Sequence, residues 1–134
     1  MVLRWYSNVI DTPDPRSLAA WWAEAIGWQK VYEADDEVVL VPGYLGSEEE
    51  ARAVPWERLP PGLVFVRVTD PKTVKNRIHL DLAPHTSQDR DAEIARLEQL
   101  GATRAEIGQD DSVSWTVLAD PEGNEFCVLS SRDF

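Results

Sequence analysis

Apolar and polar positions follow the same pattern twice along this chain. In the first copy, residues 15–26 carry apolar side chains at i, i+3, i+4, i+7 and i+8, which is the spacing of an amphipathic helix. Asp14 followed by Pro15 is a typical helix start, and Gly27 stands where a left-handed residue often ends a helix. The apolar face consists of Leu18, Trp21, Trp22, Ala25 and Ile26.

The second copy predicts a helix of the same kind. Thr86 or Ser87 is placed to cap its start, and Gly101 is placed to end it. Its apolar stripe consists of Ile94, Leu97 and Leu100. We therefore expect both helices to pack one face on a sheet.

Short runs rich in β-forming residues surround each helix. An alternating strand precedes each helix, and three runs follow it: WQKVYEA, EVVLV and LVFVRV in the first copy, and TRAEI, VSWTVLA and NEFCVL in the second. Aligning Asp11 with Asp81 matches the first strands of the two copies, and aligning Gly62 with Gly123 matches the last ones.

This repeat predicts the fold class and the domain organisation. We expect one α+β domain over residues 1–134, made of two tandem βαβββ units at about residues 3–69 and 75–131. Residues 43–61, here called the insertion, have no counterpart in the second unit. Because the insertion is polar and rich in Pro and Gly, we expect a loop, with Tyr44 and Trp56 as candidate lid residues.

Composition and charge exclude some classes of partner. The hydrophobic share of 43% and the charged share of 28% are ordinary for a globular protein. A formal net charge of −11 argues against nucleic acid and anionic membrane surfaces as partners. No apolar stretch approaches the ~18 residues of a membrane span. One cysteine cannot form an internal disulfide, which favours a reducing cytoplasm.

The segment DPEGNEFCVL places a cysteine near a carboxylate. Pro121 and Gly123 predict a turn, and the strand after it points Glu125 and Cys127 to one face because strand side chains alternate. Cys127 aligns with Val66 of the first unit, which favours a packing role. The alternative is a thiolate–imidazolium pair with His79.

A second polar group is predicted on the first strand of the second unit. Alternation puts Arg77, His79 and Asp81 on one face, with Ile78, Leu80 and Leu82 toward the helix. Buried polar groups need partners, and Glu125 is a candidate partner of Arg77. His79 and Glu125 are also the candidate acid and base if the protein is an enzyme.

The first unit offers an apolar counterpart to this polar group. Trp5, Ser7 and Val9 share one face of its first strand, and Val66 lies on its last strand with Val64 and Val68. An apolar wall with a few convergent polar groups is typical of a small-molecule site.

The tandem units together with KNRIHLDL and DPEGNEFCVL resemble the glyoxalase-like domains of the vicinal oxygen chelate superfamily, which includes glyoxalase I, bleomycin resistance proteins and extradiol dioxygenases. The resemblance covers the chain from about Leu3 to Ser131. It implies that each unit is a half-open sheet with its helix outside, and that two units enclose a barrel-like cleft within one chain or across a dimer.

The resemblance also implies where metal ligands would stand. In metal-dependent members they come from the first and last strands of each unit, and the corresponding places here are Val9, Val66, His79 and Cys127. Two valines cannot bind a metal, and Glu125 lies one same-face step from Cys127, roughly 6.5–7 Å away. We therefore expect no metal and no other cofactor, with a divalent metal as the alternative.

These observations predict a metal-independent protein that binds, and by binding sequesters, a planar or aromatic small molecule. The alternatives are a lyase or isomerase of the glyoxalase type, with or without a metal, and an interaction module whose cleft is filled by side chains. Exposed sheet edges and the resemblance both favour a homodimer.

Overall fold

The structure is a computed structural model that describes residues 2–106, 108 and 114–134. The chain divides into two compact units, residues 1–71 and 72–134. Each unit contains one four-stranded sheet and one long helix.

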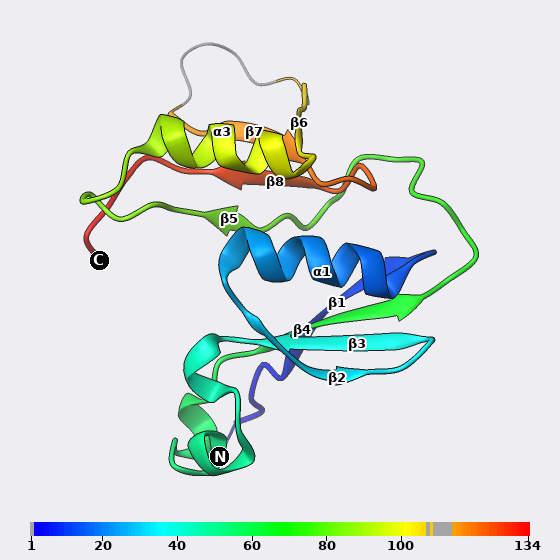
Figure 1. The fold of residues 1–134 in the computed structure, drawn as a ribbon, viewed down its shortest axis with the longest axis vertical. Helices are drawn as coiled ribbons and strands as arrows, with labels where there is room; N and C mark the ends of the chain where they lie inside the picture. Colours follow the sequence, from blue (N-terminus) through cyan, green and yellow to red (C-terminus); the bar gives the residue numbers. More distant parts are fainter. Residues whose placement is uncertain (1, 107, 109–113) are drawn as a thin grey trace. The chain divides into compact units, whose positions relative to one another are not determined.

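The sheet of the first unit combines one parallel strand pair with two antiparallel pairs. The elements of this unit are β1 (Ser7–Thr12), α1 (Pro15–Ile26), β2 (Gln29–Glu33), β3 (Glu37–Val41) and β4 (Gly62–Arg67). The strand order is β1-β4-β3-β2, with β1 parallel to β4 and the other neighbours antiparallel (Figure 1).

The predicted limits of the first helix are confirmed. The Asp14 carboxylate accepts a hydrogen bond from the Ser17 N–H at 3.2 Å, and Gly27 adopts a positive φ of 69°. α1 packs against β3 and β4, where its Trp22 is buried with Phe65 of β4. Trp21 lies edge-on to Trp22 with ring centroids 5.1 Å apart, so these two tryptophans form part of the core.

The second unit repeats this topology. Its elements are β5 (Asp81–Leu82), α3 (Arg90–Leu100), β6 (Thr103–Arg104), β7 (Thr116–Ala119) and β8 (Glu125–Val128), and the strand order is β5-β8-β7-β6. β5 pairs with β8 in parallel, as β1 pairs with β4. The predicted α+β fold with two βαβββ units is therefore confirmed.

The strand register also reproduces the alignment of the two copies. Asp11 lies opposite Val66 in the first sheet, and Asp81 lies opposite Cys127 in the second. Cys127 and Val66 therefore occupy equivalent places on the last strands of their units.

The predicted cap of the second helix was wrong. Asp89, rather than Thr86 or Ser87, caps α3, and its carboxylate accepts a hydrogen bond from the Ala92 N–H at 3.2 Å. Residues 85–88 form a turn instead, because His85 Nδ1 accepts a hydrogen bond from the Ser87 N–H and the His85 N–H donates to the side chain of Gln88. Side-chain hydrogen bonds of this kind compete with helix formation.

The predicted strand at residues 77–82 is shorter than its alternation suggests. Residues 77 and 78 form a bend, and β5 begins only at Asp81. Ile78 is 86% exposed, so the expectation that it faces the helix was wrong. The alternation fails there because a bend does not keep the two-residue period of a strand.

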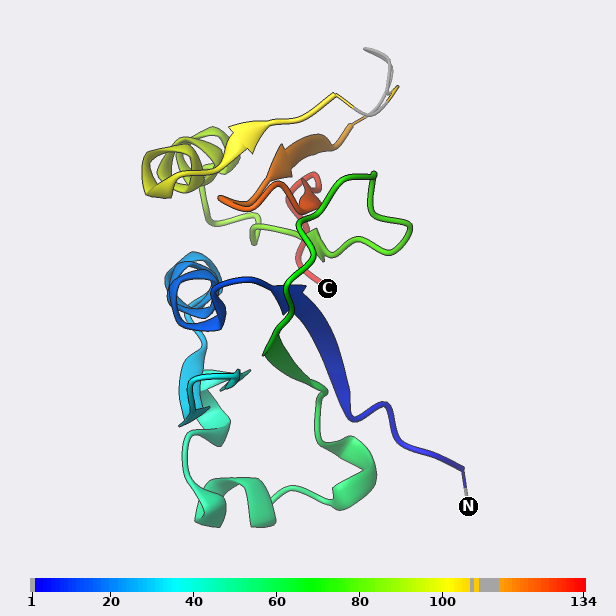
Figure 2. The ribbon, with the colours of Figure 1, turned by 90° about the vertical axis from the view of Figure 1, so that its right-hand side faces the viewer.

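The insertion is more ordered than the expected loop. It contains the 3₁₀ segments η1 (Gly43–Leu45) and η2 (Trp56–Arg58) and the short helix α2 (Glu48–Arg52). Ser47 caps α2 by accepting a hydrogen bond from the Glu50 N–H at 3.1 Å, a capping pattern visible in the sequence S-E-E-E. The insertion lies beside the N-terminal segment of its own unit (Figure 2).

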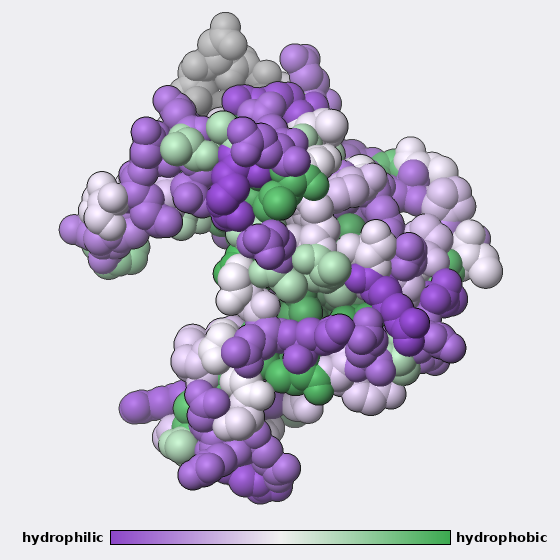
Figure 3. All heavy atoms as spheres, viewed as in Figure 1, coloured by the Kyte–Doolittle hydropathy of each residue, from purple (hydrophilic) through white to green (hydrophobic). Residues whose placement is uncertain are grey.

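The face of the molecule drawn in Figure 3 is mostly hydrophilic. Hydrophobic residues show there as small separate areas. Among the described residues, none of the helices has the length and apolar character needed to cross a membrane.

Candidate functional site

The turn before β8 sets the start of that strand. Asp120 is 2% exposed, and its Oδ1 accepts hydrogen bonds from the N–H groups of Glu122 and Asn124 at 2.9 and 3.0 Å. Gly123 has a φ of 88°, a conformation that favours glycine. This turn delivers Glu125 as the first residue of β8.

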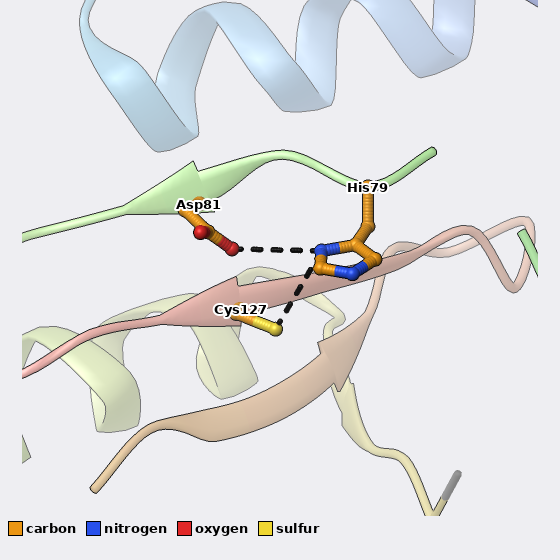
Figure 4. A group of neighbouring side chains, drawn as sticks. All are labelled: His79, Asp81 and Cys127. Carbon is orange, nitrogen blue, oxygen red and sulfur yellow. Dashed lines mark hydrogen bonds and ion pairs between the residues drawn. The ribbon is translucent and has the colours of Figure 1, made fainter. Parts of the chain in front are cut away.

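Three polar side chains of the second unit converge on the same side of β5 and β8. His79 comes from the segment that leads into β5, Asp81 is the first residue of β5, and Cys127 comes from β8 (Figure 4). His79 Nδ1 lies 3.5 Å from Asp81 Oδ1 and 3.9 Å from Cys127 Sγ. We call these three residues the His–Asp–Cys cluster.

Burial differs sharply within the cluster. The side chains of His79 and Asp81 are 39% and 49% exposed, whereas Cys127 is only 4% exposed. Burial raises the pKa of the Cys127 thiol, and the negative charge of Asp81 and a hydrogen bond with Asp81 raise it further. A protonated thiol is a weak nucleophile, so the geometry favours the packing role expected for Cys127.

The cluster does not have the arrangement of a nucleophilic triad. In such a triad the base uses one ring nitrogen for the nucleophile and the other for the orienting carboxylate. Here Cys127 and Asp81 both approach Nδ1 of His79. This leaves Nε2, on the other side of the ring, for a hydrogen bond with a ligand.

Glu125 has different partners from those expected. Its Oε1 accepts a hydrogen bond from the Lys72 ammonium at 2.9 Å, and its Oε2 accepts one from the Asn76 N–H at 3.0 Å. The expected pairing with Arg77 was therefore wrong. Arg77 is exposed at the bend, and the loop before it carries Lys72 and Asn76 to the carboxylate instead.

These contacts make Glu125 a poor acid or base. Burial raises the pKa of its carboxyl, but the hydrogen bonds from the Asn76 N–H and the Lys72 ammonium outweigh burial and lower the pKa below its usual value. Both oxygens are occupied by protein donors, so Glu125 is suited to anchoring residues 72–76 rather than to moving a proton.

The metal-ligand places implied by the resemblance fit a hard metal ion poorly. Of the four implied places, Val9 and Val66 have no donor atom. The place beside His79 is the thiol of Cys127, whereas Mn²⁺ and Mg²⁺ prefer oxygen ligands. Asp81 supplies the third donor that the sequence interpretation assigned to Glu125, and one ligand atom from each of His79, Asp81 and Cys127 lies within 4.8 Å of the others.

The residues predicted for the first unit form an apolar row. Val9 of β1 lies opposite Val64 of β4, and Val64 lies opposite Val39 of β3. Val9 is 58% exposed, while Phe65, the neighbour of Val64 in sequence, is fully buried, so the row lies on the face away from the core. On the same face, Ser7 lies two residues before Val9 on β1, and Val66 lies two residues after Val64 on β4.

The aromatic candidates of the first unit are exposed. Trp5 is 69% exposed and donates from Nε1 to the carbonyl oxygen of Ser7 at 3.2 Å. Tyr44 is 65% exposed and Trp56 is 52% exposed. A lid role for Tyr44 and Trp56 therefore stays a prediction.

Sequence reasoning missed the residue that fastens the insertion. The guanidinium of Arg4 lies 4.8 Å from the ring centroids of Tyr6 and Trp56, and its Nη1 donates to the Trp56 carbonyl oxygen at 3.1 Å. Arginine between aromatic rings is a stabilising cation–π arrangement. The alternation of Arg4 and Tyr6 was visible in the sequence, but their distant partner was not.

Comparisons with known proteins agree with this fold. A family model described as a glyoxalase-like domain matches residues 7–129. A search of curated proteins found no match to the sequence.

Several solved structures are similar over nearly the whole chain. A glyoxalase/bleomycin resistance protein/dioxygenase family enzyme from Burkholderia phytofirmans PsJN has a TM-score of 0.68 at 17% identity, covering 96% of this chain and 98% of that one. A mutant of the fosfomycin resistance protein FosX from Listeria monocytogenes, complexed with Mn(II) and dihydroxypropylphosphonic acid, has a TM-score of 0.67 at 10% identity, covering 98% and 92%. A possible glyoxalase from Bacillus cereus has a TM-score of 0.64 at 10% identity, covering 96% and 99%. At these identities the likeness concerns the fold.

Proposed function

Because the chain belongs to the glyoxalase-like domain family, we propose that it binds and sequesters a small planar or aromatic molecule without needing a metal ion. His79 of the second unit anchors the polar end of that molecule. Members of this superfamily share the fold and differ in activity, so the function has to be argued from the residues.

The observation that carries the proposal is that His79 is oriented by a carboxylate and still partly exposed. Asp81 lies at Nδ1 of His79 and orients the ring, while the side chain of His79 remains 39% exposed. Nε2 can then donate or accept one hydrogen bond, depending on the tautomer. Cys127 is buried and Glu125 is engaged by Lys72, whereas the exposed Arg77, His79 and Asp81 can meet a ligand.

A neighbour in fold supports a small ligand but differs in its metal. The fosfomycin resistance protein FosX was solved with Mn(II) and a small phosphonic acid. In this chain two of the implied ligand places are Val9 and Val66. Binding therefore rests on hydrogen bonds and apolar contacts, and Arg77 is a candidate for contact with an anionic group.

A second candidate function is catalysis of the lyase or isomerase type. The contact between His79 and Asp81 favours it, because a carboxylate that orients an imidazole is a common feature of general acid–base sites. In this version Asp81 replaces Glu125 as the partner of His79.

We further propose that the protein acts in the cytoplasm as a homodimer, in keeping with its single cysteine and its two open-edged sheets.

The test is a binding titration in the presence of EDTA. The probe is 8-anilinonaphthalene-1-sulfonate, an aromatic anion, together with a panel of uncharged planar aromatics, followed by probe fluorescence and by tryptophan quenching. His79→Ala should weaken binding by about 1–3 kcal/mol, which is roughly 5- to 150-fold, because the ligand loses its hydrogen-bond partner.

His85→Ala is the matched control, because His85 is the other histidine of the chain and lies in the turn before α3. It should bind like the wild type. Equal affinity of the wild type and His79→Ala for every probe would refute the anchoring role of His79. Turnover of a probe by the wild type that is lost in His79→Ala would support the catalytic alternative.

A further inference from the structure

The His–Asp–Cys cluster brings three different donor atoms close together. The distance from His79 Nδ1 to Cys127 Sγ is 3.9 Å, and the distance from His79 Nδ1 to Asp81 Oδ1 is 3.5 Å. The sheet fixes this convergence, because Asp81 and Cys127 are directly paired residues of β5 and β8. Figure 4 shows the imidazole facing both the carboxylate of Asp81 and the thiol of Cys127.

These distances are close to those around a tetrahedral zinc ion. With Zn–S near 2.3 Å and Zn–N and Zn–O near 2.0–2.1 Å, tetrahedral angles place sulfur about 3.6 Å from nitrogen and nitrogen about 3.3 Å from oxygen. The two separations from His79 Nδ1 exceed these values by a few tenths of an ångström, and one ligand atom from each of the three residues lies within 4.8 Å of the others. Small side-chain rotations of His79 and Asp81, which are both partly exposed, would close that gap.

We propose that the His–Asp–Cys cluster binds one thiophilic divalent cation, such as Zn²⁺ or Cd²⁺, through Cys127 Sγ, His79 Nδ1 and one carboxylate oxygen of Asp81. All three ligands belong to the second unit. Asp81 is not one of the four places that the resemblance implies, and Val9 and Val66 take no part. The site therefore differs in its ligands from a metal centre shared between two units.

The burial pattern suits a site with an open position. Cys127 supplies the buried side of the cluster, and the partly exposed His79 and Asp81 supply the side through which an ion enters. Three protein ligands leave the fourth tetrahedral position to water. The thiolate selects against Mg²⁺ and Mn²⁺, which prefer oxygen ligands.

Binding must deprotonate Cys127, because the thiolate is the form that binds a metal. Burial and the nearby Asp81 carboxylate raise the pKa of this thiol, so each bound ion releases a proton at neutral pH. This inference does not depend on the proposed function, which concerns an organic ligand bound in EDTA.

The test uses the full chain, treated with EDTA and dialysed, and the metal ion alone. Titration with Cd²⁺ should produce the ultraviolet charge-transfer band of a cadmium thiolate, saturating at one ion per chain. Co²⁺ should produce the visible absorption of a tetrahedral site. Cys127→Ser should abolish the cadmium band, and the chain has no other cysteine that could restore it.

His79→Gln and Asp81→Asn test the other two ligands without removing the thiol. Each should weaken Cd²⁺ binding by at least the roughly tenfold to hundredfold that loss of an outer-shell partner costs. His85→Gln should leave the affinity unchanged. Circular dichroism checks that each variant keeps its fold, so that a lost signal reports the site.

Two results would overturn the inference. One is the absence of a charge-transfer band at saturating Cd²⁺. The other is equal Cd²⁺ affinity in the wild type, His79→Gln and Asp81→Asn, which would mean that the thiol binds the ion alone. Failure of Cd²⁺ binding leaves the proposed organic ligand untouched, whereas a metal requirement for the organic probe would overturn only the metal-free part of the proposed function.

Discussion

Replacing Glu125 by glutamine separates an anchoring role from a chemical one. The Glu125 side chain is 13% exposed and that of Lys72 is 20% exposed, so their ion pair is largely withdrawn from water. Glutamine keeps one acceptor oxygen but places an NH₂ group against either the Lys72 ammonium or the Asn76 N–H. One charge-assisted hydrogen bond is therefore lost and two donors face each other. We expect Glu125→Gln to lower the free energy of unfolding by about 1.5–3 kcal/mol at pH 7.

The measurement is urea unfolding followed by tryptophan fluorescence. Glu48→Gln is the matched control, because Glu48 pairs with Arg52 on the surface of α2 with both side chains more than three-quarters exposed. That change should cost no more than about 0.5 kcal/mol.

Lowering the pH tests the contribution of Glu125 to stability independently. The folded pKa of Glu125 lies below its unfolded value, so its contribution to stability is fully present above the unfolded pKa, near about 4.3, and is lost as the pH falls through the folded pKa. The difference between the wild type and Glu125→Gln should therefore shrink below about pH 4. If Glu125→Gln unfolds like the wild type at pH 7 but loses probe binding or turnover, Glu125 belongs to the site and the anchoring argument is wrong.

Four further predictions concern Cys127, the insertion, metal ions and the oligomeric state. Cys127→Val should bind the aromatic probes within a few fold of the wild type, and the wild-type thiol should react more slowly with iodoacetamide than a free cysteine, because burial and Asp81 raise its pKa; loss of binding in this variant would point to a cysteine site. Arg4→Ala should expose the insertion to limited proteolysis, because it removes the hydrogen bond to the Trp56 carbonyl and two cation–π contacts; an unchanged cleavage rate would show that the insertion is held by other contacts. Adding or removing EDTA should leave the affinity for the aromatic probes unchanged, as measured by the same titration, and a loss in EDTA would show that a metal takes part. Light scattering at micromolar concentration should give about twice the 15.1 kDa mass of one chain, and the mass of a single chain would exclude the homodimer.

Much of the fold could be predicted because it follows from local periodicity. The apolar face of α1, its Asp14 cap and Gly27 are all encoded within a short stretch of sequence, and the structure confirms each of them. The repeat extended this information to the second sheet, where Asp81 and Cys127 pair as Asp11 and Val66 do. The prediction failed at the start of α3, since in the turn at residues 85–88 both the N–H and the hydroxyl of Ser87 hydrogen-bond to His85 Nδ1.

For β8 the sequence by itself determined that Glu125 and Cys127 share a strand face, because this follows from the period of two and from the turn at Gly123. The same alternation failed at residues 77–80, which precede β5. Only the tertiary structure decided which polar groups meet. Glu125 meets Lys72 and Asn76 rather than Arg77, since the irregular segment at the start of the second unit has no periodicity from which its path could be predicted. His79 meets both Asp81 and Cys127, because the parallel pairing of β5 and β8 sets their register across nearly fifty residues of chain. Whether a hydrogen bond or ion pair forms depends on differences in distance of a few tenths of an ångström. Those distances are set by packing between segments remote in sequence.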